Sequence, residues 1–380
     1  MTKMRVMWSL AAAAALLTLA VAPAGASVIR VPADEPSIQD GVSAAGSGDT
    51  VLVYPGTYSG PDNRDVDFGG LDIVLRSLGG AEVTVVDCEH EGRALHLHGG
   101  EGRSAIVQGL TFTNGEMERG GAVLCEGSSP TFRECVIEGN RGTLEGAGIA
   151  CYGAAPLVDD CYFAGNSSEI ALYGCAGGLL AADGSSVELM DTVFFGNGSD
   201  MGGALAARGG STVALSRCLV FGNGADSGGA LACLGGSNIA VEHCTISDNI
   251  SVAGTGIFCD GSSSAEASAT ILAFGYKGTA AFCVDGGTVT LECCDVYSNE
   301  YGDWTGCIED QQGVNGNISE DPLFCGPPHP LKRYSLHADS PCAVENYPEC
   351  GGIGALGVGC DATALEDISW GAFKSRYRSR

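Results

Sequence analysis

Four segments of the chain repeat one pattern: GGAVLCEGSSPTFRECVIEGN (residues 120–140), GAGIACYGAAPLVDDCYFAGN (146–166), GGALAARGGSTVALSRCLVFGN (202–223) and GGALACLGGSNIAVEHCTISDN (228–249). Each segment opens with glycine and other small residues and closes on an asparagine. The closing positions along the chain are Asn140, Asn166, Asn197, Asn223, Asn249, Gly275 and Asn299. They follow one another at intervals of 26, 31, 26, 26, 26 and 24 residues. A fixed period in this range is typical of a solenoid, in which each repeat is one coil.

Inside every repeat, apolar residues alternate with polar ones, which indicates short strands. One inward column holds Val123, Ile149, Leu180, Leu205, Leu231 and Ile257, followed two positions later by Cys125, Cys151, Ala182, Ala207, Cys233, Cys259 and Cys283. A second holds Phe132, Val158, Leu189, Leu215, Val241 and Leu291. A third holds Cys135, Cys161, Thr192, Cys218, Cys244 and Cys294, followed by Ile137, Phe163, Phe194, Val220, Ile246 and Val296. With Gly-Gly and Gly-Ser as turns between these runs, the sequence predicts an all-β fold. It is a right-handed parallel β-helix solenoid with three short strands per coil of about 26 residues.

The rest of the chain divides around these coils. Residues 1–26 are predicted to be a signal peptide, because Lys3 and Arg5 precede an apolar run and small residues precede Ser27. Residues 27–60 are expected to form an N-terminal cap, with a short helix that begins at Ser37. Residues 61–305 carry the β-helix coils, 306–360 a Cys-rich C-terminal cap, and 361–380 a basic tail. This organisation predicts an exported monomer, secreted or held at the cell surface, without a transmembrane segment in the mature chain.

The charge of the chain limits its partners. The sequence has 46 acidic and 19 basic residues, a net charge of −27. Removal of the signal segment leaves 17 basic residues against 46 acidic ones, a net charge of −29. Such a chain repels phosphate groups, so nucleic acids and anionic membranes are excluded as partners.

Several motifs resemble known families. The Φ-x-x-Asn and Gly-Gly-Ala-Φ motifs at Phe163–Asn166, Gly202–Leu205 and Gly228–Leu231 resemble the repeat of chlamydial polymorphic outer-membrane proteins. Gly48–Val51 with Pro55–Tyr58, and Gly316–Ile318 with Asp321–Cys325, resemble the ends of secreted bacterial β-helix proteins of the pectate-lyase-like superfamily. The resemblance implies the fold but no single activity, because this fold carries lyases, hydrolases, adhesins and structural proteins.

One candidate site is a column of outward charged residues just before each closing strand. Neighbouring coils are about 4.8 Å apart, so Asp159, Asp160, Asp191, Arg217 and His243 are expected to form one polar cluster. Paired carboxylates could act as acid and base on a polysaccharide. The alternative is a solvated turn with alternating charges. The sequence indicates no metal site and no cofactor, with Ca²⁺ on such carboxylates as the one alternative.

A second candidate is an outward aromatic stripe beside the asparagines, consisting of Tyr162, Phe195, Phe221 and Tyr297. An exposed apolar stripe usually marks a contact surface, and stacked aromatic rings suit sugar rings. The alternative is a stripe covered by a loop. The nearest long loop is the five-residue excess of the 31-residue coil, near Ser167–Cys175.

The 18 cysteines fall into two groups. Those in the inward columns are predicted to be buried thiols, because parallel neighbours stand slightly too far apart for an unstrained disulfide. Those outside the columns are Cys88, Cys175, Cys293, Cys307, Cys325, Cys342, Cys350 and Cys360. The last four lie in the C-terminal cap, which has little core of its own, and are predicted to form disulfides.

Two functions remain open on the sequence. The first is a non-catalytic binding or adhesion module that recognises a glycan or a protein. The alternative is a polysaccharide lyase or glycoside hydrolase that uses the outward carboxylates. An enzyme would require two carboxylates, or a carboxylate cluster with Arg217, at the floor of a groove.

Overall fold

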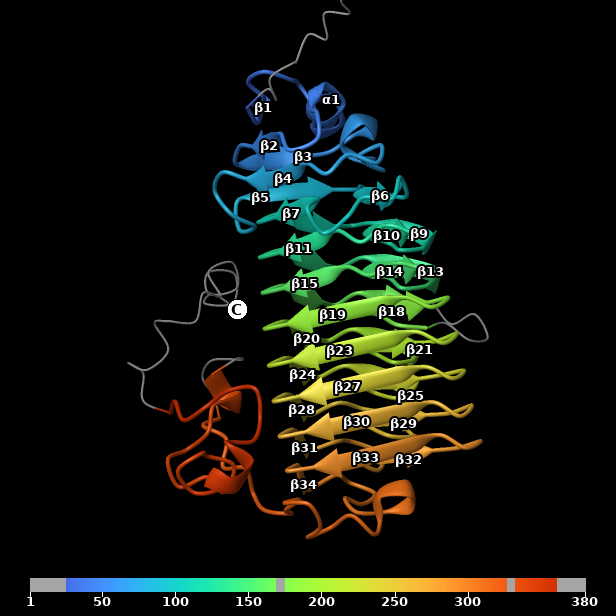
Figure 1. The fold of residues 1–380 in the computed structure, drawn as a ribbon, viewed down its shortest axis with the longest axis vertical. Coiled ribbons are helices and arrows are strands. Elements are labelled where there is room, and N and C mark those ends of the chain that lie inside the picture. The colour runs from blue at the N-terminus through green and yellow to red at the C-terminus, as the bar shows by residue number, and fades with distance from the viewer. Residues whose placement is uncertain (1–24, 169–174, 327–331, 361–380) are drawn as a thin grey trace, which may run out of the picture.

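A computed structural model describes residues 25–168, 175–326 and 332–360. The described chain is a tall stack of parallel β coils with four sheets running along it (Figure 1). The predicted fold class is therefore confirmed. All but the last two residues of the predicted signal segment, and the whole basic tail 361–380, lie outside the described residues. No helix in the described part of the chain is both long enough and apolar enough to span a membrane.

Three sheets form the walls of the stack. Sheet A has 11 strands, in the order β1 (Val28–Val31), β2 (Thr50–Val53), β4 (Val74–Ser77), β7 (Ile106–Gln108), β11 (Thr131–Arg133), β15 (Leu157–Asp159), β19 (Ser186–Met190), β23 (Thr212–Ser216), β27 (Asn238–Glu242), β30 (Ser264–Ser268) and β33 (Thr288–Glu292). Sheet B has 10 strands, β3 (Gly56–Tyr58), β5 (Thr84–Asp87), β8 (Thr111–Thr113), β12 (Val136–Glu138), β16 (Tyr162–Ala164), β20 (Val193–Phe195), β24 (Leu219–Phe221), β28 (Thr245–Ser247), β31 (Ile271–Ala273) and β34 (Asp295–Tyr297). Sheet C has 8 strands, β6 (Leu95–Leu97), β10 (Val123–Glu126), β14 (Ile149–Tyr152), β18 (Leu179–Ala182), β22 (Leu205–Ala207), β26 (Leu231–Cys233), β29 (Ile257–Cys259) and β32 (Ala281–Cys283).

A fourth, smaller sheet was not predicted. Sheet D has 5 strands, β9 (Glu116–Arg119), β13 (Arg141–Glu145), β17 (Ser167–Ser168), β21 (Gly198–Met201) and β25 (Gly224–Ser227). It follows the closing asparagines and leads into the glycine pair that starts each sheet C strand. Met201 and Ala253 pack against the outward side chains of sheet C, among them Ala206 and Ala232. The small residues after each glycine pair therefore leave room for the chain to fold over sheet C.

The register of the inward columns agrees with the sequence pattern except in the 31-residue coil. There Leu179 and Ala181, not Leu180 and Ala182, pair with Leu205 and Ala207. The slip occurs because Ala176, with φ at +61°, occupies the position that the first glycine takes in other coils. Gly178 then stands at the position of Ala204 and Ala230 in the next two coils. An alignment based on the glycine pair alone therefore placed the inward residues of this coil one position out of register.

The two ends of the stack are closed differently. At the N-terminal end, α1 (Ile38–Ala44) begins at Ser37, whose side chain accepts a hydrogen bond from the Asp40 N–H, and it buries Ile38 and Val42. A short 3-10 turn, η1 (Pro61–Asn63), follows. At the other end, η2 (Gly306–Ile308) places Ile308 in the core below the last coil.

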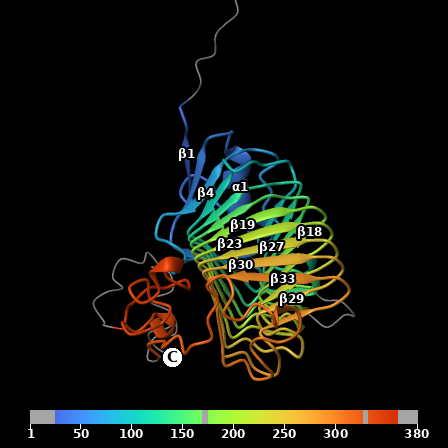
Figure 2. The ribbon, with the colours of Figure 1, turned by 60° about the horizontal axis from the view of Figure 1, so that its bottom comes forward.

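The remainder of the predicted C-terminal cap does not close the end of the stack. Residues 319–326 and 332–360, which we call the side cap, fold back along the outside of the coils (Figures 1 and 2). The side cap contains two short turns, η3 (Lys332–Tyr334) and η4 (Pro348–Cys350).

The cysteine predictions are confirmed in the main and wrong in two places. The disulfides are Cys283–Cys307, Cys293–Cys350 and Cys325–Cys360. Cys342, predicted to be bridged, is a buried thiol, whereas Cys283, predicted to be a thiol, bonds Cys307. Cys283 lies on the last sheet C strand, where no further coil stacks on it, so its partner comes from the closing turn instead.

Candidate functional site

The predicted polar cluster lies at the corner where each coil passes from sheet A to sheet B. One residue per coil turns this corner in the left-handed conformation, with φ between 46° and 53°; these residues are Glu134, Asp160, Asp191, Arg217, His243, Ala269 and Cys293. Their backbone N–H groups bond to the next coil, as from Arg217 to the Glu242 carbonyl at 3.0 Å. Aspartate tolerates this conformation better than most residues. The corner is thus shaped by the backbone, and its side chains point outward. We call these residues the corner column.

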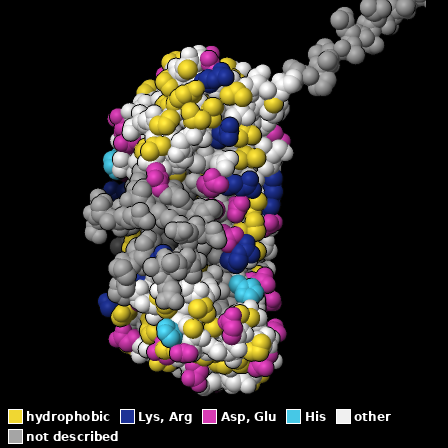
Figure 3. Space-filling view, turned by 90° about the vertical axis from the view of Figure 1, so that its left-hand side faces the viewer, with side chains coloured by type: hydrophobic (Ala, Val, Ile, Leu, Met, Phe, Trp, Pro, Cys, Tyr) yellow, Lys and Arg dark blue, Asp and Glu magenta, His cyan; other side chains and the backbone are white. Residues whose placement is uncertain are grey.

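Ion pairs occupy two of the three carboxylates that were proposed as catalytic, Asp159 and Asp191. Arg217 holds Asp191 through two hydrogen bonds, Nε–Oδ1 at 2.8 Å and Nη2–Oδ2 at 2.6 Å. This contact raises the pKa of Arg217 above its usual value. Asp159 accepts a bond of 3.1 Å from Arg133 Nε. The row of alternating acidic and basic side chains is visible along one edge of the face in Figure 3. The geometry matches the solvated, alternating-charge interpretation more closely than an acid–base pair.

The aromatic stripe is covered by the side cap. Phe221 and Tyr162 are buried, and Phe195 is partly buried. Phe195 stacks on Phe221 with ring centroids 4.8 Å apart, and Phe221 in turn meets Tyr334 of the side cap at 4.8 Å. The predicted loop lies mostly outside the described residues, and its last residue, Cys175, packs on sheet C. A segment more than 100 residues downstream therefore covers the stripe.

Tyr297, the last residue of the predicted stripe, is half-buried below the other three. Its ring meets Phe274 edge-on at 5.7 Å, and Phe274 contacts Phe324 of the side cap at 6.0 Å. All four predicted binding residues thus belong to the side cap's contact with sheet B or to its margin. They explain how the side cap docks rather than how a ligand binds.

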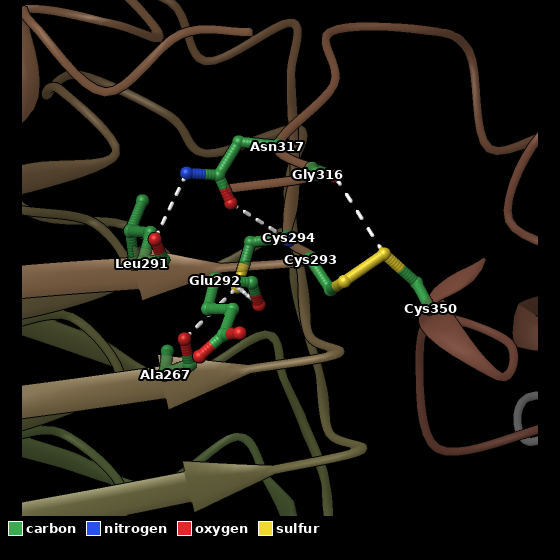
Figure 4. The surroundings of a disulfide bond; sticks show 8 residues. All are labelled: Ala267, Leu291, Glu292, Cys293, Cys294, Gly316, Asn317 and Cys350. Carbon is green, nitrogen blue, oxygen red and sulfur yellow. Dashed lines mark hydrogen bonds between the residues drawn. A yellow bond between two sulfur atoms is a disulfide. The ribbon is translucent and has the colours of Figure 1, made fainter. Parts of the chain in front are cut away.

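The side cap is fixed to the corner column by covalent and polar contacts. Cys293 is the last member of that column and forms a disulfide with Cys350 (Figure 4). Next to it, Asn317 accepts a bond from the Cys294 N–H and donates one to the Leu291 carbonyl, both at 2.9 Å. One coil higher, the Gly354 N–H bonds to the Ala269 carbonyl at 2.8 Å.

Above these contacts, a half-open cavity of about 320 Å³ separates the side cap from the corner. His243 of the corner column lines one side of it, and Glu345 of the side cap lines another. The aliphatic side chains of Leu336, Ile353 and Leu356 complete the walls. His243, one of the five residues proposed as catalytic, therefore faces this cavity.

A second feature is an exposed apolar patch on the side formed by sheets C and D. It consists of Ile250, Val252, Tyr276, Phe282 and Tyr301, which are 38–71% exposed. We call it the apolar patch. Ile250 and Tyr276 are bridge partners on neighbouring coils. The Tyr301 N–H bonds to the Gly278 carbonyl of the coil before it at 3.2 Å. These contacts place the patch on three successive coils.

Sequence reasoning missed the apolar patch, although a signal was present. The position directly after each closing residue reads Arg141, Ser167, Gly198, Gly224, Ile250, Tyr276 and Glu300. Pairing along sheet D shows that Arg141 to Tyr276 form one column. The column changes from polar residues and glycine to isoleucine and tyrosine in the last coils. The sequence did not predict sheet D, so it did not predict this column either.

Within the described residues, no three His, Cys, Asp or Glu side chains come together as metal ligands. The predictions concerning Ca²⁺ and cofactors remain untested.

Comparisons with known proteins agree with the architecture. A family described as a right-handed β-helix region matches residues 170–317. Among solved structures, the crystal structure of pectate lyase Pel9A superimposes with a TM-score of 0.51 at 10% sequence identity, covering 88% of this chain and 97% of that one. No curated protein sequence matches the chain. The chain is therefore a right-handed β-helix with the fold of a pectate lyase; the resemblance to chlamydial repeats stays a prediction.

Proposed function

Taking a right-handed β-helix of the pectate-lyase fold as the premise, we propose that this protein is an exported, non-catalytic module that binds a neutral glycan. The apolar patch is the observation that carries the proposal. Most large apolar side chains of the coils are buried, and an exposed cluster of them usually marks a contact surface.

The composition of the apolar patch favours a sugar as the ligand. Tyr276, Phe282 and Tyr301 offer three rings on neighbouring coils, and tyrosine combines an apolar face with a polar hydroxyl. Phe282 stacks on the buried Phe258 with an interplanar angle of 8° and ring centroids 6.2 Å apart, which fixes its orientation. Rings held in this way can pack against the C–H face of a pyranose while the hydroxyls form hydrogen bonds.

The charge of the protein distinguishes between neutral and acidic sugars as ligands. Glu300 precedes Tyr301 in the sequence, and its carboxylate accepts a bond of 2.8 Å from the Lys277 N–H beside Tyr276. The whole chain carries a net charge of −27. The net charge of the chain opposes a uronate polymer, so the proposed ligand is a neutral glycan and not pectate.

The corner column supports a non-catalytic function. Asp191 and Asp159 are held by Arg217 and Arg133. Asp191 is a poor candidate for a general base, because the bidentate arginine occupies both of its oxygens. The polysaccharide-cleaving alternative would require these pairs to open around a substrate.

The proposal is tested by affinity electrophoresis of the purified protein through gels that contain neutral glucan, mannan, galactan or polygalacturonate. At least one neutral polymer is expected to retard the protein, while polygalacturonate is not. The double variant Tyr276→Ala/Tyr301→Ala should lose about tenfold or more in affinity, roughly 1.4 kcal/mol. Leu78→Ala/Val83→Ala is the matched control, since it removes two exposed apolar side chains at the other end of the stack.

Retardation that survives the tyrosine variant would reject the apolar patch as the site. Release of shorter oligosaccharides, lost in Asp191→Asn, would replace the proposal with the cleaving alternative. Export is checked separately by sequencing the N-terminus of protein recovered outside the cytoplasm, which should start at Ser27.

A further inference from the structure

The cavity between the side cap and the corner column has no part in the function proposed above. Its walls are held in place without a ligand. The Ile353 N–H bonds to the Cys342 carbonyl at 2.9 Å, and the Leu336 N–H bonds to the Gly357 carbonyl at 3.0 Å. On the other side, the Ala355 N–H bonds to Thr245 Oγ1 at 3.0 Å, next to His243 in the coil. A cavity of about 320 Å³ with such fixed walls is within the range of small-molecule sites.

The polar groups of the cavity are available to a ligand. Elsewhere in the corner column, Glu134 accepts a bond from Gln108, Asp191 is held by Arg217, and Cys293 is in a disulfide. Within the described part of the chain, the His243 imidazole and the Glu345 carboxylate have neither a hydrogen bond nor an ion pair. A neutral imidazole has one acceptor nitrogen, and a carboxylate only accepts. Both groups can therefore accept hydrogen bonds from the same ligand.

The other residues that line the cavity indicate what the rest of the ligand is like. Leu336, Ile353, Leu356 and Val358 present aliphatic surface, and no lysine or arginine of the described chain lines the cavity. Glu242, beside His243 in the sequence, is exposed and adds negative charge nearby. The site is thus apolar in its walls and negative at its polar groups. We propose that this cavity binds a small amine with an apolar body, whose ammonium group meets Glu345 and His243.

The test uses three probes of one shape. Cyclohexylamine, cyclohexanol and cyclohexanecarboxylate are titrated into the full-length protein by ligand-observed NMR. The amine is expected to bind at least about tenfold more tightly than the alcohol, and the carboxylate is expected not to bind. Equal binding of amine and alcohol would overturn the proposal, since it would show an apolar cavity without charge recognition. Absence of amine binding would overturn it as well.

Two substitutions locate the site. Glu345→Gln keeps the shape of the side chain and should weaken amine binding about tenfold. His243→Asn should weaken it too, and asparagine tolerates the left-handed backbone at this position. Glu349→Gln, an exposed carboxylate on the same cap outside the cavity, is the control and should leave binding unchanged. If Glu349→Gln reduces binding as much as Glu345→Gln, the amine recognises surface charge and the proposed site is wrong. Unchanged thermal unfolding temperatures show that each variant is folded.

Discussion

At the scale of single residues, buried amides connect the coils, and one buried carboxylate lies where the last coil meets the side cap. Asn223 is a member of the asparagine column: its Nδ2 donates to Asn249 Oδ1 at 3.0 Å and to the Phe194 carbonyl at 3.0 Å. The left-handed residue of this turn is the one before the asparagine, such as Gly222, and not the asparagine itself. The asparagines therefore act by satisfying buried backbone groups.

Asp295 is a different kind of buried group. It is fully buried where the last coil meets the side cap. Its Oδ1 accepts a bond of 3.1 Å from the Glu320 N–H, and its Oδ2 faces the Cys342 thiol at 3.2 Å. Burial raises the pKa of Asp295 from 3.8 to about 7. Close to neutral pH, part of the population thus carries a buried negative charge at the attachment of the side cap.

This shift predicts how stability varies with pH. The folded protein holds the Asp295 proton more tightly than the unfolded chain does. The contribution of protonated Asp295 to the free energy of unfolding is therefore intact below about pH 4 and is lost as the pH rises to about 7. The loss amounts to roughly 4 kcal/mol. Asp295→Asn should remove this slope and be more stable than the wild type at pH 8, as measured by urea unfolding from pH 5 to 8. Asp321→Asn, an exposed carboxylate of the same cap, should follow the wild type. Parallel curves for wild type and Asp295→Asn would contradict the prediction.

At the scale of elements, glycine pairs and one disulfide decide where segments can lie. A Cβ on Gly203 would stand 2.3 Å from the Gly229 carbonyl oxygen of the next coil. The glycine pairs are therefore needed for coils to stack where sheet D turns into sheet C. The side cap, in contrast, shares no sheet with the coils. It is held by the Cys293–Cys350 disulfide, a few backbone bonds and the packing of Tyr334 on Phe221.

Removing that disulfide should release the side cap while the coils stay folded. Cys293→Ser/Cys350→Ser is expected to destabilise the cap by about 2–4 kcal/mol and to expose the stripe around Phe221. Increased fluorescence of a hydrophobic dye and faster proteolysis after residue 318, with an unchanged β circular dichroism spectrum, would show this. Cys325→Ser/Cys360→Ser removes a bridge within the cap and serves as the control. Equal dye binding by wild type and the Cys293→Ser/Cys350→Ser variant would mean that packing and hydrogen bonds hold the cap without the disulfide.

At the scale of the whole molecule, the interior of the stack is lined by thiols. All twelve cysteines outside the three disulfides are buried. Burial raises the pKa of several of them, to about 12 for Cys294 and well above the usual value for Cys161 and Cys244. These three thiols are therefore protonated. The buried cysteines pack as small apolar side chains.

The number of free thiols can be counted by alkylation. The native protein should react with iodoacetamide at few or no sites, whereas the protein unfolded in guanidinium without reductant should gain twelve modifications by mass spectrometry. Reduction before alkylation should give eighteen, the total number of cysteines. Fewer than twelve modifications without reductant would show that stacked pairs such as Cys218 and Cys244 are oxidised, and that the thiol prediction is wrong.

The sequence by itself determined the coil. Each coil stacks only on its neighbours about 26 residues away, so inward and outward positions recur at a fixed spacing and can be aligned by eye. The columns of Phe132 and of Cys135 were aligned correctly in this way. The slip at Leu179 arose where the period was interrupted and an alanine replaced a glycine in the turn.

Only the tertiary structure decided which outward side chains are accessible. Phe221 and Tyr334 are separated by more than 100 residues, and nothing periodic relates them, so the covering of the aromatic stripe could not be derived from spacing. The same holds for His243, which shares a cavity with Glu345 because the side cap returns along the stack. Contacts between coils repeat along the chain, but docking of the side cap occurs once, and a single long-range contact leaves no pattern in the sequence.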